Sequence, residues 1–300
     1  MTMLLTEFIK AGTQRLEALY PTKEAHNIVL ALCQDIIGTK NYTHIVEPEF
    51  VVPQARIPDL ESGMERLCKG EPIQYVVGKA EFCGYEFKVN RDVLIPRPET
   101  EILVREAVKV ASRIQRMRIP YGKSAKPVTV LDLCTGSGCI AWSVALSLPG
   151  VEVTGLDISE AALSVAKSQN FSALLKSSGA IAPKFIMGDI LEEPALQGEF
   201  DLILSNPPYI MEKEKPLLRS NVRDFEPPVA LFVKDDDPLV YYRAIARWSS
   251  LLLAPQGAGL TEINDCLGSE TKHVFSDAGF SETEVVRDFY EKKRFVFYKK

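Results

Sequence analysis

The sequence lacks the features of a membrane protein and of a typical DNA-binding protein. No segment reaches the roughly 18 uninterrupted apolar residues of a membrane span, and no basic region followed by an apolar run opens the chain. There is no long basic block and the net charge is −5, so a broad electrostatic contact with DNA is not expected. We therefore expect a cytoplasmic protein with no membrane contact and no direct sequence-specific contact with nucleic acid.

Patterns that bind metals are missing as well. The six cysteines include no Cys-x-x-Cys pair, and the three histidines are far apart in the sequence. Structural zinc needs four Cys or His ligands at characteristic short spacings, so we expect no metal site. The cysteines are expected to be reduced thiols that are mostly buried.

The length and the hydrophobic pattern predict two domains joined by a linker. The chain has 300 residues, of which 46% are hydrophobic and 25% charged, as in ordinary globular proteins. Residues 1–70 repeat apolar side chains every three or four positions, which predicts three to five helices, with Thr22 as the N-cap of the second and Pro58 beginning the third. Residues 71–96 alternate apolar and polar side chains from Ile73 onward, which predicts a β-hairpin linker.

The remaining residues, 97–300, form the larger predicted domain. Pro98 begins a helix that extends to about Ala111. Strands are predicted at 128–133, 151–158, 185–190, 200–204 and 259–263, with helices between them at 139–148, 160–176, 238–253 and 267–278. This alternation predicts an α/β fold with a parallel, doubly wound sheet. Segments 281–289 and 294–298 follow without a helix between them, which predicts an antiparallel hairpin at the edge of the sheet.

The fourth strand of this sheet runs directly into Asn206-Pro207-Pro208-Tyr209, which we call the acceptor turn. Proline has no N–H, so the two prolines end the strand and leave carbonyl oxygens without local donors, to which Asn206 adds a side-chain acceptor. Acceptors beside an aromatic ring suit a planar group that carries an NH2, such as an amide or a base amine, with its face on Tyr209. The alternative is an ordinary strand-ending turn, but all four residues together after a strand favour a functional site.

Three other strand ends predict a nucleoside site. After the first strand, the segment 134–138 turns at once into a helix, and its glycines let the backbone pass close under a ligand. The second strand ends at Asp157, which can accept both ribose hydroxyls, and the third ends at Asp189-Ile190, which can bind an adenine amine and flank the ring. The full G-x-G-x-x-G spacing, a Walker lysine and an arginine directly after Asp157 are absent, so NADP and ATP fit poorly.

Together these motifs resemble the class I S-adenosylmethionine-dependent methyltransferases. Among these, the chain is most similar to the HemK/PrmC type of protein-(glutamine-N5) methyltransferase, which modifies peptide chain release factors. The similarity covers nearly the whole chain and rests on segments 74–78, 94–101, 132–138, 155–159, 205–209, 225–227 and 262–264. Two departures stand out: Cys134 occupies a position where the family usually has glycine, and residues 288–294 represent the family's closing Asp-x-x-Gly-x-x-Arg segment only loosely, without its glycine, so we assign them no ligand role.

The resemblance implies a class I methyltransferase (Rossmann-like) domain and a reaction. A monomer would transfer a methyl group from S-adenosyl-L-methionine to the N5 amide nitrogen of a glutamine in class I release factors, acting in translation termination. Asn206, Pro207, Pro208 and Tyr209 would bind the substrate amide, and Asn206, Pro207 and Tyr209 would act in catalysis. The implied cofactor-binding residues are Cys134, Thr135, Gly136, Ser137, Gly138, Asp157, Asp189, Ile190 and Asn206. The helices of residues 1–70, which have no chemical signature, would recognise the protein substrate.

Two other classes of function are weighed against this one. Adenine-N6 DNA methyltransferases use the same acceptor turn for a base amine, but this chain has no basic recognition domain with which to hold a duplex. A non-catalytic binding module would not require both an intact acceptor turn and a glycine loop. Labelled S-adenosylmethionine separates these possibilities, because the label ends in protein, in DNA or in neither.

Overall fold

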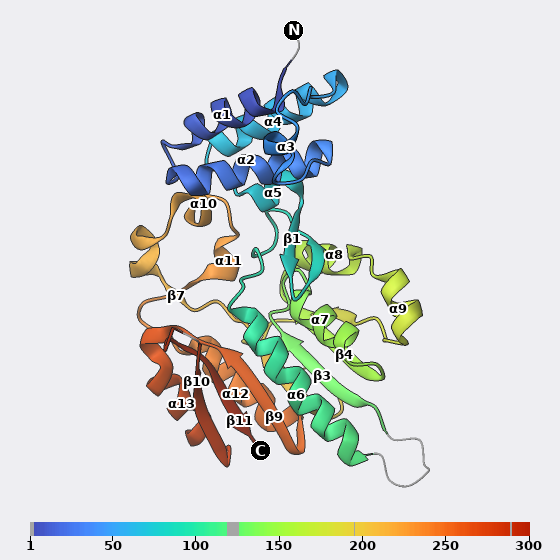
Figure 1. Cartoon of the computed structure of the whole chain (residues 1–300). Coiled ribbons are helices and arrows are strands. Elements are labelled where there is room, and N and C mark those ends of the chain that lie inside the picture. The colour runs from blue at the N-terminus through green and yellow to red at the C-terminus, as the bar shows by residue number, and fades with distance from the viewer. Residues whose placement is uncertain (1–2, 119–125, 195, 289) are drawn as a thin grey trace. The chain divides into compact units, whose positions relative to one another are not determined.

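The computed structural model describes residues 3–118, 126–194, 196–288 and 290–300 (Figure 1). Its contacts divide the chain into two compact units, Met1–Lys79 with Leu218–Phe225, and Ala80–Leu217 with Glu226–Lys300. Within the described residues, no helix combines the length and the apolar character needed to cross a membrane.

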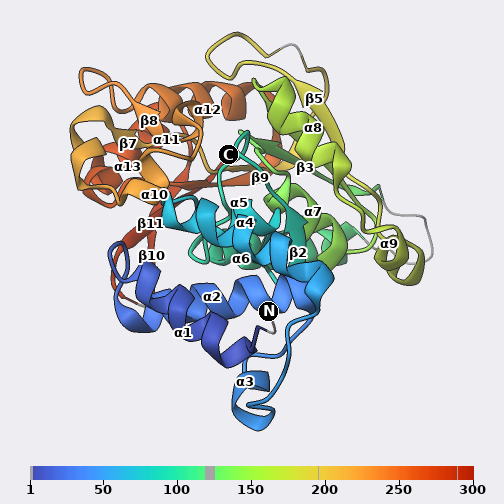
Figure 2. The ribbon, with the colours of Figure 1, turned by 90° about the horizontal axis from the view of Figure 1, so that it is seen from above.

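The first unit is a bundle of helices, as predicted (Figure 2). Its elements are α1 (Leu5–Leu16), α2 (Thr22–Ile37), α3 (Thr43–Val46), the 3-10 turn η1 (Gln54–Arg56), α4 (Ile57–Cys68), α5 (Ile73–Val77) and α10 (Ser220–Arg223). Helices α1, α2 and α4 pack together around the buried side chains of Val29, Leu32 and Met64. A glycine allows α4 to approach α2 closely, because a Cβ on Gly63 would lie 2.6 Å from the Leu32 side chain.

Two details of this unit differ from the sequence prediction. Thr22 is the first residue of α2 and not its N-cap, since Pro21 occupies the cap and the Thr22 hydroxyl donates to Glu17 at 2.9 Å. Residues 73–77, predicted as the start of the hairpin, form helix α5. Pro72 stands just before this helix, and Gly78 ends it with a left-handed φ of +76°. The hairpin is therefore shorter than predicted and consists of β1 (Lys79–Phe82) and β2 (Tyr85–Lys88).

The second unit contains a seven-stranded sheet in the order β10-β11-β9-β6-β3-β4-β5. The strands are β3 (Val128–Leu133), β4 (Val151–Asp157), β5 (Lys184–Met187), β6 (Phe200–Ser205), β9 (Leu253–Glu262), β10 (Glu282–Arg287) and β11 (Lys293–Lys299). The five strands from β3 to β9 in this set are parallel, and β11 is antiparallel to both β9 and β10. The prediction of a doubly wound sheet with an antiparallel edge is confirmed. The winding reverses at β3, the point where open α/β sheets bind ligands.

Helices cover both faces of this sheet (Figure 1). They are α6 (Thr100–Arg118), α7 (Cys139–Ser147), α8 (Glu160–Ser168), α9 (Ser172–Ser178), α12 (Val240–Leu252) and α13 (Gly268–Asp277), and the unit also contains the short helix α11 (Pro228–Leu231). Short elements complete the unit: β7 (Ile210–Met211), β8 (Phe232–Val233) and the 3-10 turns η2 (Glu212–Leu217) and η3 (Asp265–Leu267). Val128 and Val130 of β3 face a core built with α6 and α7, and Leu131 and Leu133 face one built with α12 and α13. These faces follow the alternation of side chains along a strand.

The helices differ from the prediction in two places. The single helix expected at 160–176 is divided into α8 and α9 at Gln169, a buried residue whose amide binds backbone groups of other segments. Its oxygen accepts the Lys88 N–H, and its NH2 donates to the carbonyl oxygens of Lys88 and Ser137. Helix α6 continues past the expected Ala111 to Arg118, where the guanidinium forms an ion pair with Asp201. No elements were predicted between residues 210 and 233, where β7, η2, α10, α11 and β8 form.

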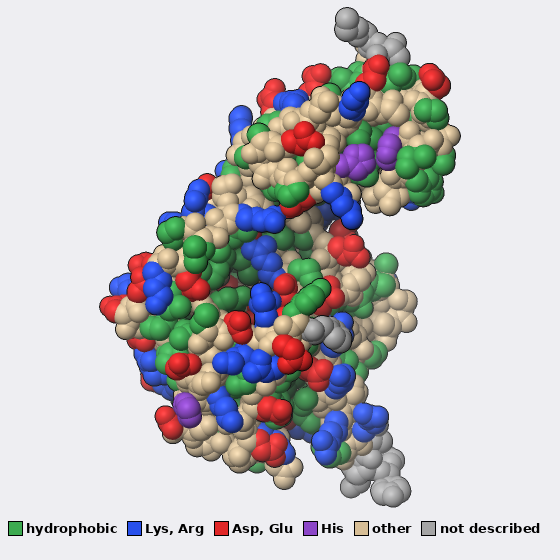
Figure 3. All heavy atoms as spheres, turned by 60° about the vertical axis from the view of Figure 1, so that its left-hand side comes forward, with side chains coloured by type: hydrophobic (Ala, Val, Ile, Leu, Met, Phe, Trp, Pro, Cys, Tyr) green, Lys and Arg blue, Asp and Glu red, His purple; other side chains and the backbone are tan. Residues whose placement is uncertain are grey.

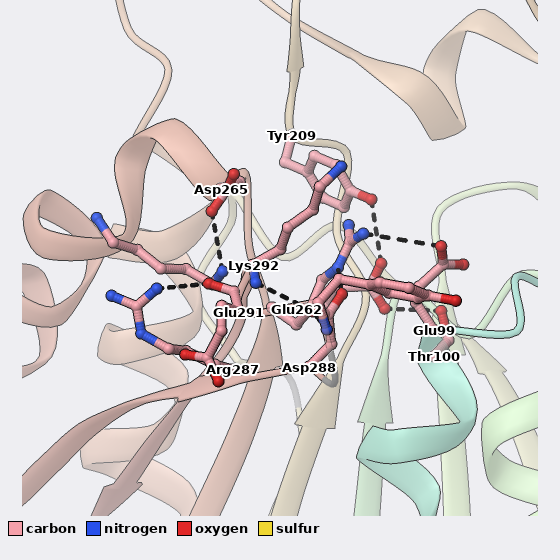
Figure 4. A network of polar contacts seen from close by, with 12 residues as sticks. Glu99, Thr100, Tyr209, Glu262, Asp265, Arg287, Asp288, Glu291 and Lys292 are labelled. Atoms are coloured by element: carbon pink, nitrogen blue, oxygen red, sulfur yellow. Dashed lines mark hydrogen bonds and ion pairs between the residues drawn. The ribbon is translucent and has the colours of Figure 1, made fainter.

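The described residues of the closing segment between β10 and β11 are held by Asp288. Asp288 accepts the backbone N–H groups of Tyr290 and Lys292 and a hydrogen bond of 2.8 Å from Arg294 (Figure 4). The hydrogen bond from Arg294 contributes most to holding the pKa of Asp288 below its usual range. Glu291 stands where the family's glycine is expected, and its φ of +61° lies in the left-handed region. Glu291 thus adopts a backbone conformation that favours glycine although it carries a side chain. Phe289, predicted as the last residue of the strand, lies outside the described residues.

This turn yields a prediction about stability. Glu291→Gly should raise the free energy of unfolding by about 0.5–1 kcal/mol. Glycine has no Cβ and so avoids the strain of a left-handed backbone, but part of this gain is lost because glycine gives up more backbone entropy on folding. Glu291→Ala is the matched control, since it removes the same exposed carboxylate but keeps the Cβ, and it should not stabilise the protein. Urea unfolding measures both variants. Equal stabilities for the two would show that the turn carries no strain at this residue.

Candidate active site

A pocket in the second unit lies at the carboxyl ends of β3, β4, β5 and β6. The residues predicted for the site that line it are Cys134, Thr135, Gly136, Ser137, Asp157, Asp189, Ile190, Asn206 and Pro208. Gly138, Pro207 and Tyr209 are not part of the lining. The sheet therefore brings the glycine loop, both aspartates and the start of the acceptor turn around one space.

The glycine loop contains two glycines with different roles. Gly136 has a φ of +55° and lines the pocket, and a Cβ added to it would meet no other atom within 4 Å. Gly138 has a φ of +77°, and a Cβ there would lie 3.0 Å from both Ala166 and Phe185. Gly136 thus keeps the space beside the loop open, whereas Gly138 allows α8 and β5 to pack closely behind it.

Cys134 departs from the family's glycine without closing the pocket. Its φ of +59° is left-handed, a conformation that costs a side chain roughly 1–2 kcal/mol, and it still lines the pocket. Burial, reinforced by the carboxylates of Asp157 and Asp132, raises the pKa of the Cys134 thiol well above its usual range. The residue is therefore a neutral thiol and not a nucleophile.

Two aspartates hold the glycine loop in place. Asp157 accepts the Gly136 N–H at 2.8 Å with one oxygen and the Ser159 N–H at 2.9 Å with the other. Burial raises the pKa of Asp157, and these backbone hydrogen bonds oppose the shift. Each of its oxygens keeps a further lone pair for a ligand hydroxyl. Asp132, at full burial, accepts the Thr135 hydroxyl at 2.6 Å, and its burial raises its pKa to about 7.

The acceptor turn is tied to a buried carboxylate at the end of β9 (Figure 4). The Asn206 NH2 donates to the Thr100 hydroxyl oxygen at 3.2 Å, and the Thr100 hydroxyl donates to Glu262 at 2.7 Å. The Tyr209 hydroxyl donates to the other oxygen of Glu262 at 3.0 Å. Glu262 is 2% exposed, and this burial raises its pKa while both hydroxyl groups oppose the shift. One carboxylate thus connects the first and last residues of the turn.

Further contacts fix the backbone of the turn and leave it rich in acceptors. The Asn264 NH2 donates to the Tyr209 carbonyl at 3.1 Å and to Glu214 at 3.0 Å. Because the Asn206 NH2 is engaged by Thr100, the Asn206 side-chain oxygen is the atom left to accept, and the two prolines that follow have no N–H. An arrangement of this kind can hold an incoming NH2 group.

Several residues of the site had no role in the sequence prediction. Thr100, Glu262 and Arg97 stood in the segments that carry the family resemblance, but nothing in their spacing showed what they contact. Arg97 is the one basic residue among the described lining residues, and its guanidinium lies 2.6 Å from Glu226, which is 3% exposed. Tyr241 of α12 also lines the pocket, and a helical tyrosine in the sequence carries no signal of such a place.

Comparison with known proteins adds to this geometry. The family model described as a methyltransferase domain matches residues 124–246, and the model described as the PrmC N-terminal domain matches residues 7–78. The solved structure of the hMettl16 catalytic domain in complex with MAT2A 3'UTR hairpin 6 has a TM-score of 0.53 at 11% identity, covering 84% of this chain and 85% of that one. At that identity the likeness shows the class I methyltransferase fold alone.

Relatives with similar sequences extend over both units. The release factor glutamine methyltransferase of Bacteroides thetaiotaomicron is 36% identical over 293 residues, which cover 97% of this chain and 98% of that protein. The protein of the same name from Flavobacterium psychrophilum is 34% identical over 294 residues, 98% of each. Similarity at this level over nearly the full length of both relatives shows that the chain belongs to the family of release factor glutamine methyltransferases.

Proposed function

We propose that the protein methylates the N5 amide nitrogen of a glutamine side chain in peptide chain release factors, using S-adenosyl-L-methionine and releasing S-adenosyl-L-homocysteine. The observation that carries the proposal is the direction of the Asn206 amide, whose NH2 is bound by Thr100 and whose oxygen is left to accept at a pocket shared with the glycine loop. The names of the relatives, release factor glutamine methyltransferases, supply the substrate class.

The residues of the pocket fit S-adenosylmethionine. Gly136 leaves open space beside the loop, Asp157 has lone pairs for ribose hydroxyls, and Asp189 with Ile190 suits the adenine ring. We propose as binding residues Cys134, Thr135, Gly136, Ser137, Gly138, Asp157, Asp189, Ile190 and Asn206. When bound, this cofactor supplies an electrophilic methyl carbon attached to a sulfonium.

The residues of the acceptor turn act on the substrate amide. The Asn206 oxygen and the Pro207 carbonyl would accept its two N–H groups, and these fixed acceptors would stabilise the positive charge that develops on the nitrogen. An amide is a weak nucleophile, so orientation must supply much of the rate, and it can contribute up to about 7–11 kcal/mol. Tyr209 would pack on the amide plane and Pro208 would line the site. The proton can leave after methylation, when the nitrogen is strongly acidic, so no dedicated base is required.

No observation favours methylation of adenine in DNA. A base amine offers the same two donors, but a duplex would need a surface that attracts phosphates. The net charge of the chain is −5, and acidic and basic side chains are interspersed on the face that Figure 3 presents. The relatives are named for release factors and not for DNA.

We also propose that three segments of the chain have different functions. Residues 1–70 would recognise the release factor, residues 71–96 would link the domains, and residues 97–300 would form the methyltransferase domain. Among the described residues that line the pocket, none falls in residues 1–70, four belong to the linker (Asp92, Val93, Leu94 and Pro96) and the others belong to residues 97–300, which supports the assignment of chemistry to the third segment. A monomer in the cytoplasm, where translation termination takes place, would be the active form.

The first test concerns the acceptor turn. Asn206→Ala should lower turnover by roughly 10²–10³, the loss typical when one preorganised electrostatic contact is removed. The affinity for S-adenosylhomocysteine, measured by calorimetry, should stay within a few-fold and serves as the control for folding. The assay supplies purified release factor and labelled cofactor, and mass spectrometry locates the methyl group. Turnover close to that of the wild type would remove Asn206 from the reaction.

The second test concerns the ribose contact. Asp157→Ala should weaken S-adenosylhomocysteine binding by about 1–3 kcal/mol, because two buried hydroxyls lose their acceptor. Thermal unfolding without ligand measures separately what the loss of the hydrogen bonds to Gly136 and Ser159 costs the fold. An unchanged dissociation constant would mean that the ribose lies elsewhere.

The third test concerns the helical bundle. A fragment that begins at Ala80, with a short Gly/Ser linker in place of Leu218–Phe225, removes the whole first unit. It should bind S-adenosylhomocysteine with similar affinity and methylate whole release factor more than about tenfold more slowly, because a glutamine-bearing loop alone offers less than the ~800 Å² per partner of an ordinary protein interface. Initial rates at equal concentrations of bound cofactor decide the matter. A fragment as fast as the full chain would assign the bundle another role.

A further inference from the structure

Glu262 is an unusual carboxylate in this fold. It is 2% exposed, it does not line the pocket, and it forms no ion pair within the part of the chain that the structure describes. Arg294, a nearby cation, is engaged with Asp288 at 2.8 Å and with Glu99 at 3.7 Å (Figure 4). A buried charge without an ion pair is costly, so its hydrogen bonds must hold it in place.

The chemistry of these hydrogen bonds fixes their direction. A carboxylate only accepts, so the hydroxyl groups of Thr100 and Tyr209 must both donate to Glu262. Thr100 has one hydroxyl proton, which is thereby used, so its oxygen can only accept from the Asn206 amide at 3.2 Å. The NH2 group of the Asn206 amide therefore faces Thr100, and its side-chain oxygen points away from Thr100. With Glu262 ionised, the orientation of this amide follows from donor and acceptor chemistry.

We propose that Glu262 and Thr100 are positioning residues for methyl transfer, which hold the Asn206 amide with its oxygen available to the substrate NH2. The inference deepens the proposed function and rests on it. Without this chain of hydrogen bonds the Asn206 side-chain amide can rotate by about 180° between two orientations. In one of them its own NH2 group faces the NH2 group of the substrate. Two donors cannot bind each other, so that orientation is unproductive.

The same carboxylate also holds the Tyr209 hydroxyl. Its two oxygens therefore set the direction of the amide at one end of the acceptor turn and the position of the ring at the other. Thr100 binds one oxygen of Glu262 and Tyr209 binds the other, so substitutions at Thr100 test the amide while the hydrogen bond from Tyr209 to Glu262 keeps both of its partners.

The test uses the full-length chain and compares two substitutions at Thr100. Thr100→Val removes the hydroxyl at nearly constant volume, and Thr100→Ser keeps the hydroxyl. With purified release factor at saturation, Thr100→Val should lower kcat by about 10- to 100-fold, the cost of misplacing a reacting group, and Thr100→Ser should stay within about threefold of the wild type. Cofactor affinity should be unchanged in both. Binding stoichiometry for S-adenosylhomocysteine gives the folded fraction to which each kcat is normalised.

A double-mutant cycle separates positioning from a structural effect. If Thr100 acts through Asn206, then Thr100→Val in an Asn206→Ala background should change the residual kcat by less than about threefold. A loss in that background as large as in the wild type overturns the proposal, and so does equal kcat for Thr100→Val and Thr100→Ser. Where Thr100→Val fails to bind cofactor, Thr100→Ala takes its place in the same cycle. A wild-type chain that leaves release factor unmethylated would instead contradict the proposed function.

Discussion

The register of the parallel strands determines where the groups at the strand ends of the site lie. Leu133 of β3 pairs with Leu156 of β4 and with Ser205 of β6, and Ser205 pairs in turn with Thr261 of β9. The residues that follow this row are Cys134, Asp157, Asn206 and Glu262. Four groups from distant parts of the sequence therefore share one level of the sheet. A shift of one residue in any of these strands would turn a polar group away from the site.

Two of the four described residues other than glycine that have a left-handed backbone stand where the resemblance to the family leads us to expect glycine. Cys134 in the glycine loop and Glu291 in the closing turn both have left-handed φ values. Such conformations persist only where the surrounding contacts fix them. In the loop these contacts come from Asp132 and Asp157, and in the turn they come from Asp288. The shape of each segment is thus fixed by carboxylates that bind its polar groups.

Helices and strands that depend on a local residue pattern could be predicted from the sequence. Contacts between residues far apart in the sequence could not. The strand at 128–133 was predicted to the residue because a β-branched run there is bounded by a turn. The prediction of a strand at residues 73–77 was wrong. Val76 and Val77 favour strands locally, but Pro72 just before the segment and packing against α2 and α4 make it helical. The hydrogen bond from Thr100 to Glu262 spans 162 positions, and no spacing in a single sequence encodes it. The roles assigned to the predicted site residues stay predictions.

Side-chain contacts connect helix α6 and strand β6 at both ends of the helix. At one end the Asn206 NH2 donates to Thr100, and at the other the Arg118 guanidinium pairs with Asp201. Helix α6 is 19 residues long, or roughly 28 Å, so the ion pair lies far from the chemistry yet limits how the helix can slide. Heat that loosens this distant pair would free the helix to move along the strand. Activity would then decline at temperatures below those at which the whole protein unfolds.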